Sequence, residues 1–148
     1  MRIKLLFGGI LKFKKLDPAA KISYPAMKND VGYDLCSIEE KTIVAKSSEI
    51  IRTGLSFEIP EDYYGELHTR SGQGVKNTMR IHPGVIDAGY RGEITIRIYN
   101  LGNGEYTIKK GDKIAQLIIK PRIVIPLKQV DQLKETERGF KGLGSTGR

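Results

Sequence analysis

The stretch GEITIRIYN (residues 92–100) alternates apolar and polar side chains with a period of two. In an extended chain its isoleucines fall on one face and its other large side chains on the opposite face. The first face carries Ile94, Ile96 and Ile98, and the second carries Thr95, Arg97 and Tyr99. Because this alternation is typical of a half-buried strand, the stretch predicts a β-strand that packs on an apolar core.

The sequence on both sides repeats the pattern in short segments. YTIKKGDKIAQLIIKPRIVIP (residues 106–126) contains two β-branched runs with turn residues between them, and TIVAKSSEIIRTGLSFEIP (residues 42–60) reads as a further pair. Short strands separated by turn signals favour an all-β sandwich or barrel. The helical candidate is a turn or two after Ser71 and Gly72, where Ser71 is expected to act as the N-cap.

Composition narrows the classes of partner. Lys and Arg number 25, and Asp and Glu number 17, so the 148-residue chain carries a net charge of +8. This excess fits an anionic partner, either nucleic acid or a phosphorylated small molecule, and fits equally a surface that keeps the protein in solution. The single cysteine, Cys36, excludes an internal disulfide framework, and with two histidines it argues against structural zinc.

The N-terminal apolar run, residues 5–11, is short, contains two glycines and is stopped by Lys12. It has neither the length of a membrane span nor the form of a signal peptide. We therefore expect a single-domain protein that is intracellular, cytoplasmic and without a membrane partner.

Two stretches offer groups that bind anions or metals. DVGYDL (residues 30–35) places Asp34 after a Gly-Tyr pair, where the carboxylate is either functional or a turn cap. TRSGQGVK (residues 69–76) offers the Arg70 guanidinium, the Ser71 hydroxyl and the open backbone amide of Gly72. These groups suit phosphate, although an arginine in a polar turn is an equally good reading.

HPGVIDAGYRGEI (residues 82–94) places Asp87 directly after the apolar pair Val85-Ile86. A hairpin tip at Ala88 and Gly89 would hold this carboxylate half-buried, where it can take a proton from water. The Tyr90 ring suits stacking on a sugar. The alternative is an aspartate that only opens a type I turn.

Two further stretches carry polar groups outside any simple strand pattern. In GDKIAQLII (residues 111–119), Gln116 interrupts an apolar strand and needs a hydrogen-bond partner, either a ligand phosphate or a neighbouring strand. The C-terminal RGFKGLGSTGR (residues 138–148) combines glycines, hydroxyls and basic residues that can wrap a polyanion. A frayed basic tail is the ordinary alternative.

Taken in order, DVGYDL, TRSG, PGVIDAGYRGEI, GDKIAQLI and RGFKGLGSTG resemble the five motifs of the trimeric dUTP pyrophosphatases, or dUTPases, from about Lys12 to the C-terminus. The resemblance implies a distorted, jelly-roll-like β-barrel of the β-clip type, assembled as a homotrimer with active sites at subunit interfaces. It implies a barrel domain over residues 1–135, with an extension strand at 1–10. Residues 136–148 would form a flexible glycine-rich arm that closes over the site.

The resemblance further implies hydrolysis of dUTP to dUMP and pyrophosphate with Mg²⁺, which keeps uracil out of DNA and supplies dUMP for thymidylate synthesis. Asp87 matches the residue that activates the water attacking the α-phosphorus, and Asp34 matches a carboxylate that reaches the metal through water. Tyr90 matches the ring beneath the deoxyribose. The implied substrate-binding residues are Arg70, Ser71, Gly72, Gly84, Val85, Ile86, Tyr90, Thr95, Gln116, Arg138, Leu143, Gly144, Ser145 and Thr146.

The arm departs from the family pattern at two positions. Leu143 stands where the family usually has an aromatic that stacks on uracil, and Lys141 stands where glycine is usual. Leucine can cover the base but loses stacking worth on the order of 1 kcal/mol. Phe140 lies near enough in sequence to replace the ring in a shifted register.

Three other functions remain as alternatives. A dCTP deaminase shares the fold but carries a catalytic glutamate where this chain has Arg97, which cannot shuttle that proton. A nucleic-acid-binding barrel needs exposed aromatics on its strands, and aromatics make up only 7% of this chain, so no stable nucleic-acid binding is expected. A dUTPase fold reused as a nucleotide-binding regulator is the third.

Overall fold

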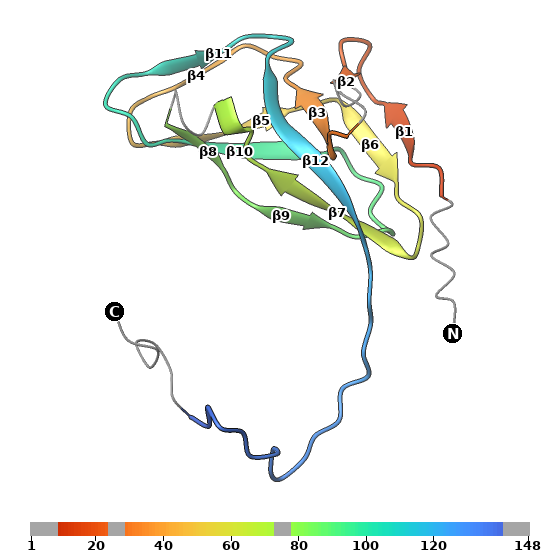
Figure 1. Cartoon of the computed structure of the whole chain (residues 1–148). Helices are drawn as coiled ribbons and strands as arrows, with labels where there is room; N and C mark the ends of the chain where they lie inside the picture. The colour runs from red at the N-terminus through yellow and green to blue at the C-terminus, as the bar shows by residue number, and fades with distance from the viewer. Residues whose placement is uncertain (1–8, 24–28, 73–77, 141–148) are drawn as a thin grey trace.

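The computed structural model describes residues 9–23, 29–72 and 78–140, and these residues form an all-β structure (Figure 1). The strands are β1 (Lys12–Lys15), β2 (Ile22–Ser23), β3 (Gly32–Cys36), β4 (Lys41–Ile43), β5 (Ser48–Arg52), β6 (Leu55–Glu58), β7 (Tyr63–His68), β8 (Met79–Ile81), β9 (Gly84–Ile86), β10 (Thr95–Asn100), β11 (Tyr106–Ile108) and β12 (Lys113–Pro121). Among the described residues, no helix has the length and hydropathy of a membrane span.

The strands pair into four antiparallel sheets. The largest has the order β2-β3-β12-β7-β9, so β12 lies at its centre and β9 at one edge (Figure 1). A second sheet has the order β5-β10-β8, and the pairs β1-β6 and β11-β4 complete the set. Most of these neighbours are far apart in sequence, so the fold depends on long-range pairing rather than on consecutive hairpins.

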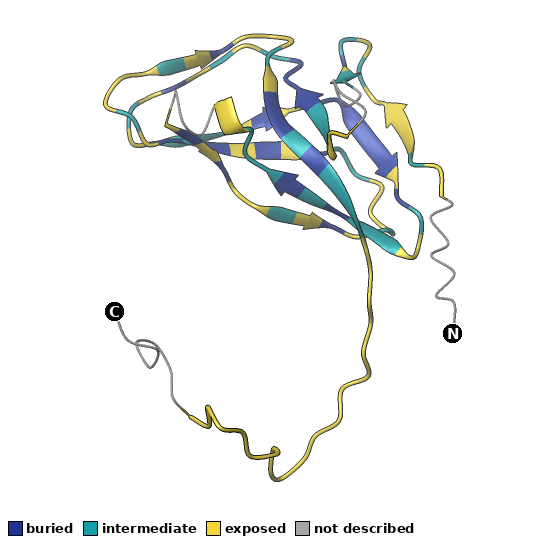
Figure 2. Cartoon of the chain, viewed as in Figure 1, coloured by how far each residue is buried: buried dark blue, intermediate teal, exposed yellow. Residues whose placement is uncertain are grey.

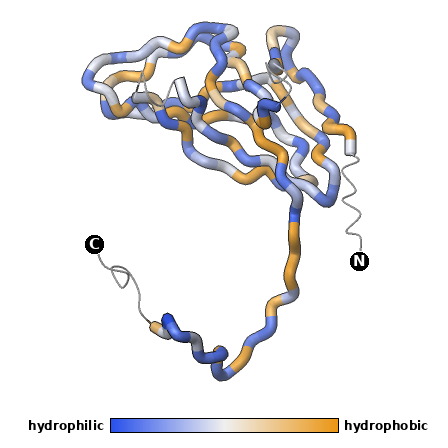
Figure 3. Tube along the Cα trace, viewed as in Figure 1, coloured by the Kyte–Doolittle hydropathy of each residue, from blue (hydrophilic) through white to orange (hydrophobic). Residues whose placement is uncertain are grey.

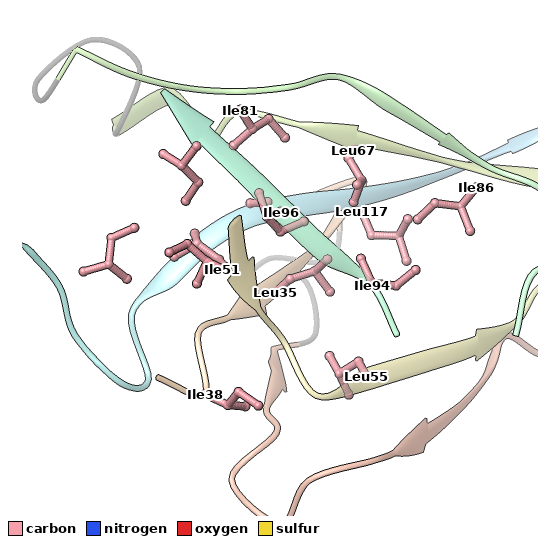
Figure 4. Close-up of a cluster of buried hydrophobic side chains, with 14 of the residues drawn as sticks. Leu35, Ile38, Ile51, Leu55, Leu67, Ile81, Ile86, Ile94, Ile96 and Leu117 are labelled. Atoms are coloured by element: carbon pink, nitrogen blue, oxygen red, sulfur yellow. The ribbon is translucent and has the colours of Figure 1, made fainter. Parts of the chain in front are cut away.

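The alternation predicted over residues 92–100 is confirmed, and the strand itself, β10, spans Thr95–Asn100, so it begins three residues later than predicted. Ile94, Ile96 and Ile98 are at most 3% exposed, whereas Thr95 and Arg97 face solvent. The isoleucines pack between the sheets with residues from β3, β6, β7 and β12 (Figure 4). Each side chain removed from water contributes about 1.5–3 kcal/mol to folding. The alternation of β10 therefore builds the core.

The buried polar side chains form hydrogen bonds to the backbone of neighbouring segments. The Thr53 hydroxyl donates to the backbone oxygen of Ile94 at 2.6 Å, and the Asn100 amide donates to the backbone oxygens of Ile43 and Gly104 at 2.9 and 2.8 Å. Within the described part of the chain, every buried side-chain nitrogen or oxygen has a hydrogen-bond partner. The polar groups of the core are thus satisfied internally.

Residues 42–60 form parts of three strands, β4, β5 and β6, where the sequence predicted two. Lys46 lies between β4 and β5 and Gly54 between β5 and β6, and their φ angles of 59° and 66° are left-handed, a conformation that strands do not adopt. The run at residues 113–126 is also shorter than predicted. Since β12 ends at Pro121, the apolar residues that follow it pack on nothing in the described chain.

Every described residue from Pro121 onward is exposed, and this segment extends away from the sheets (Figure 2). Ile123, Val124 and Ile125 are 81%, 69% and 77% exposed, and they form the apolar stretch that leaves the sheets in Figure 3. The division at residues 135 and 136 stays a prediction. Ser71 and Gly72 are themselves helical, so Ser71 does not precede the predicted turn as its cap, and the turn or two expected after Gly72 lies outside the described residues.

Gly65 lets β7 approach the core closely, and its replacement tests the packing. A Cβ atom there would lie 2.8 Å from Leu117 Cδ1 and 3.2 Å from Ile59 Cδ1. We expect Gly65→Ala to lower the free energy of unfolding by about 1–3 kcal/mol, as overpacking in a core does. Gly104→Ala is the control, because a Cβ atom there meets nothing within 4 Å. Equal urea midpoints for the two variants would contradict this packing.

Candidate functional site

Strand β9 leads directly into a tight turn, which we call the Asp87 turn (residues 87–90). The backbone N–H of Tyr90 donates to the Asp87 carbonyl at 3.0 Å, which closes the turn. The Arg91 guanidinium donates to the carbonyl oxygens of Ala88 and Tyr90 at 2.6 and 3.0 Å. The turn is therefore held at a fixed geometry by its own backbone and by the next side chain.

A cavity of about 180 Å³ lies beside this turn, and we call it the turn cavity. It brings together five residues that the sequence assigned to the site: Val85, Ile86, Asp87, Tyr90 and Thr95. Three others that sequence reasoning did not assign complete the lining: Leu67, Glu93 and Ile94. Its wall thus combines apolar side chains with one aromatic ring and two carboxylates.

Asp87 is exposed, where the sequence predicted a half-buried carboxylate. The reason is the position of β9, whose described sheet neighbour is β7 alone, so no second strand covers the turn. Asp87 also opens a turn, as the alternative interpretation predicted. Val85 is 66% exposed for the same reason, and only Ile86 of the apolar pair is buried.

A second cavity of about 430 Å³, the ion-pair cavity, lies between β3, β12 and the start of the Ser71 helix. It contains Asp34, whose Oδ1 accepts from Arg70 Nε at 2.8 Å and whose Oδ2 lies 2.9 Å from Lys113 Nζ. Its lining is Asn29, Asp30, Val31, Gly32, Asp34, Arg70, Ser71, Lys113 and Gln116. Four of these are sequence-predicted site residues, namely Asp34, Arg70, Ser71 and Gln116.

Gln116 lies opposite Asp34 across the β3-β12 pair and opposite His68 across the β12-β7 pair. Its amide nitrogen donates to the carbonyl oxygen of Thr69 at 3.4 Å. The partner in the chain is therefore the backbone at the end of β7. The side chain is half-buried and lines the ion-pair cavity, so it remains within reach of a ligand there.

Lys113 is a residue of the ion-pair cavity that sequence reasoning missed. A strict period of two places residues 113 and 116 on opposite faces of a strand. The β3-β12 pairing shifts register between Lys113 and Ala115, and such a bulge turns the preceding side chain toward the other face. The sequence signal for this contact is the motif GDKIAQL, which places a lysine three residues before Gln116.

The described residues include no side chain that lines both cavities. Gly84 lines a neighbouring cavity with Glu66 and His68, and Gly72 follows Ser71 in an exposed position. Arg138 lies on the exposed segment after β12. The remaining predicted residues, Leu143, Gly144, Ser145 and Thr146, lie outside the described residues, as does most of the predicted extension at residues 1–10.

The described residues contain no cluster of three or more His, Cys, Asp or Glu side chains that could hold a metal by themselves. The ion-pair cavity does supply the Asp34 carboxylate, with Asp30 also in its wall. Mg²⁺ prefers oxygen ligands and commonly keeps water while binding one or two carboxylates and substrate phosphates. The residues present therefore fit a magnesium ion that arrives with a phosphorylated ligand.

Glu66 is the centre of a network between β7 and β12. Its Oε2 accepts from Lys120 Nζ at 2.6 Å and lies 2.9 Å from His68 Nε2, and its Oε1 accepts from the Tyr64 hydroxyl at 2.9 Å. The hydrogen bond from Lys120, followed by those from His68 and Tyr64, lowers the pKa of Glu66 to about 2. The same bonds to Glu66 raise the pKa of Lys120 and of Tyr64.

The chain matches known proteins over most of its length. The family model for dUTPase matches residues 19–147. The deoxyuridine 5'-triphosphate nucleotidohydrolase of Clostridium tetani is 44% identical over 140 residues, which cover 93% of this chain and 97% of that protein.

Two solved structures from phages are also similar. The dUTPase of Staphylococcus bacteriophage 80alpha with dUpNHpp, from work on how phage dUTPases control transfer of virulence genes, superposes with a TM-score of 0.89 at 34% identity, over 95% of this chain and all of that one. A mutant dUTPase from phage phi11 of S. aureus, solved with a structural Mg(II) ion, gives a TM-score of 0.81 at 31% identity, over 86% of this chain and all of that one.

Acid titration tests the Glu66 network. The pKa of Glu66 is depressed from 4.5 to about 2, so its contribution to stability is present above pH 4.5 and is lost as the pH falls through about 2. We expect Glu66→Gln to be less stable than wild type at neutral pH, with the difference shrinking between these two values. The measurement is urea unfolding across this pH range. A difference that stays constant with pH would show that the carboxylate charge plays no part.

Proposed function

Since the chain belongs to the dUTPase family and is a dUTP diphosphatase, we propose that a water activated by Asp87 attacks the α-phosphorus of dUTP. The observation that carries this proposal is the turn cavity, where Asp87 stands beside an aromatic ring and an apolar wall. A nucleoside bound in this cavity would bring its α-phosphorus close to Asp87. A water between the two could then give its proton to the carboxylate.

The turn cavity is proposed to bind the nucleoside. Tyr90, 47% exposed at the mouth of the cavity, lies beneath the deoxyribose and leaves no room for a 2′-hydroxyl. Strand β9 pairs with β7 along one edge, and the sheet order places no described strand on its other edge. Its backbone N–H and C=O groups there can bind the uracil edge, and the closeness of the hairpin (residues 84–90) excludes the methyl of thymine.

The ion-pair cavity is proposed to bind the phosphates through Arg70, Ser71 and Gln116, with Gly72 supplying a backbone amide. The charged groups in its wall are Asp30, Asp34, Arg70 and Lys113, which balance to zero. A triphosphate therefore needs further positive charge. Arg138 of the arm is proposed to bind the γ-phosphate, and Mg²⁺, with Asp34 holding it through water, supplies charge neutralisation when bound.

The chain is proposed to act as a homotrimer of jelly-roll-like barrels, with each site shared between subunits. Support comes from the two cavities, which share no lining residue in one chain, and from the exposure of Asp87 and Val85. The exposed stretch at Ile123, Val124 and Ile125 gives a subunit an apolar surface that a neighbour can cover. The arm, including Leu143 and Gly144 to Thr146, then closes over the site of a neighbouring subunit.

The Asp87 carboxylate takes a proton from water as the water oxygen bonds to the α-phosphorus, and the bond from that phosphorus to the bridging oxygen of the β-phosphate breaks. The electron pair leaves on pyrophosphate, and dUMP remains. Positioning and electrostatic stabilisation by the phosphate-binding residues account for most of the rate. In the cytoplasm, the reaction keeps uracil out of DNA and supplies dUMP for thymidylate synthesis.

The deaminase alternative is disfavoured by Arg97. Its side chain is exposed on β10 and donates to the Ser48 hydroxyl of β5 at 3.1 Å, and it lines neither cavity. A regulatory role that uses nucleotide binding stays a candidate, because the similar 80alpha phage enzyme comes from a group that controls transfer of virulence genes. An assay of nucleotide hydrolysis distinguishes the pyrophosphatase from a regulator that only binds nucleotide.

The function is tested by pyrophosphate release from dUTP, dCTP, dTTP and UTP, each with Mg²⁺ and with EDTA. We expect metal-dependent release from dUTP alone.

Asp87→Asn is expected to lower kcat at least a hundredfold and to leave nucleotide binding in place, because the amide keeps the shape of the side chain but cannot accept the proton. A variant that keeps more than about a tenth of the wild-type kcat, roughly 1.4 kcal/mol of barrier, removes Asp87 from the base role. Release from none of the four nucleotides by wild type would favour the regulator.

A further inference from the structure

We propose that Gly92 is a positioning residue for Tyr90, and that the missing side chain at residue 92 sets the preference for deoxyribonucleotides over ribonucleotides. The inference rests on the proposed role of Tyr90 beneath the sugar. It adds a residue that does not itself line the turn cavity and that was not among the site residues predicted from the sequence.

The Tyr90 ring lies directly against the backbone of Gly92. A Cβ atom built on Gly92 would overlap the Tyr90 hydroxyl oxygen and would lie 2.5 Å from Cζ and 3.0 Å from Cε2 of the ring. Cβ atoms in folded proteins essentially never approach other atoms this closely. The observed place of the ring is therefore available only while residue 92 is glycine.

Two hydrogen bonds hold Tyr90 in this place. Its backbone N–H donates to the Asp87 carbonyl at 3.0 Å, and its hydroxyl donates to the Glu93 carbonyl at 3.1 Å. The ring spans from the Asp87 turn to the backbone of residues 92 and 93. We call these two residues the seat of the ring.

The seat is anchored from the opposite side. Glu93 Oε1 accepts from the backbone N–H of Gly54 at 2.8 Å, and its Oε2 lies 3.1 Å from Arg52 Nε. The backbone N–H of Ile94 donates to the carbonyl of Leu55 at 2.8 Å. Since the seat is tied to strands β5 and β6, a methyl group at residue 92 displaces the ring rather than the backbone.

The conflicting atoms all belong to the far end of the Tyr90 side chain, which can rotate toward solvent because the residue is 47% exposed. The φ angle of Gly92 lies outside the left-handed region, so alanine does not strain the backbone there. A methyl group at residue 92 is therefore expected to misplace the ring and to change the free energy of unfolding only slightly. A general packing defect would instead lower stability and the turnover of every substrate alike.

The test compares kcat/KM for dUTP and for UTP in wild type and in Gly92→Ala, with Gly104→Ala as the matched control because a Cβ atom there has open space. We expect Gly92→Ala to lower the dUTP/UTP ratio about tenfold, within the range that one pocket contact provides, and to shift Tm by only a few degrees. Gly104→Ala is expected to keep the wild-type ratio. An unchanged ratio in Gly92→Ala overturns the proposal.

A double-mutant cycle shows whether Gly92 acts through Tyr90. We expect Tyr90→Ala to lower the ratio and the added Gly92→Ala to lower it no further, because the displaced group is already absent. Additive losses would contradict the positioning role. If Tyr90→Ala leaves the ratio unchanged, the proposed role of Tyr90 fails; if Tyr90→Ala lowers it and Gly92→Ala does not, only the present inference fails.

Folding of the single variant is checked in the same cycle. Should Gly92→Ala fail to fold, recovery of the fold in the Tyr90→Ala background would show that the methyl group and the ring compete for one place, as proposed. Continued loss of the fold in the double variant would assign Gly92 to the backbone of the fold and would overturn the proposal.

Discussion

The antiparallel pairing of β12 with both β3 and β7 is the constraint on which the site depends. The inner face of β12 places Leu117 opposite Leu67 and builds the core, while the outer face places Gln116 opposite Asp34. The bulge at the start of β12 then turns Lys113 to Asp34, which completes the ion pairs. One strand thus supplies core packing on one side and the polar ion-pair cavity on the other.

In the proposed site, the charges of the ion-pair cavity leave a triphosphate in need of positive groups from elsewhere. Asp34 already engages Arg70 and Lys113, so a triphosphate bound here, as proposed, would compete with this carboxylate for Arg70. A bound cation that occupies Asp34 would free these side chains for phosphate. The exposed Asp87 and Tyr90 likewise need a covering surface to exclude water. In the proposed trimer, each cavity of one chain would therefore form half of a complete site.

The strands were predictable where a single period governs them, and Ile94, Ile96 and Ile98 follow the alternation as expected. The motif order also identified nine residues that line the two cavities. Features that depend on long-range pairing were not predictable, because the exposure of Asp87 follows from the edge position of β9 and the direction of Lys113 follows from a bulge. The position of the Tyr90 ring depends on its close approach to Gly92. In the sequence, this residue does not differ from any other glycine.

Subunit mixing tests most directly whether the turn cavity of one subunit works with the ion-pair cavity of another, as the proposed trimer requires. Asp87→Asn and Arg70→Ala chains, each expected to be inactive alone because one proposed half of the site is impaired, would be unfolded and refolded together, and mixed oligomers confirmed with two different affinity tags. Random assembly would then place two intact halves together in about a quarter of the sites, so activity should return to about a quarter of wild type. Mixed oligomers that stay as inactive as the separate variants would contradict the shared site.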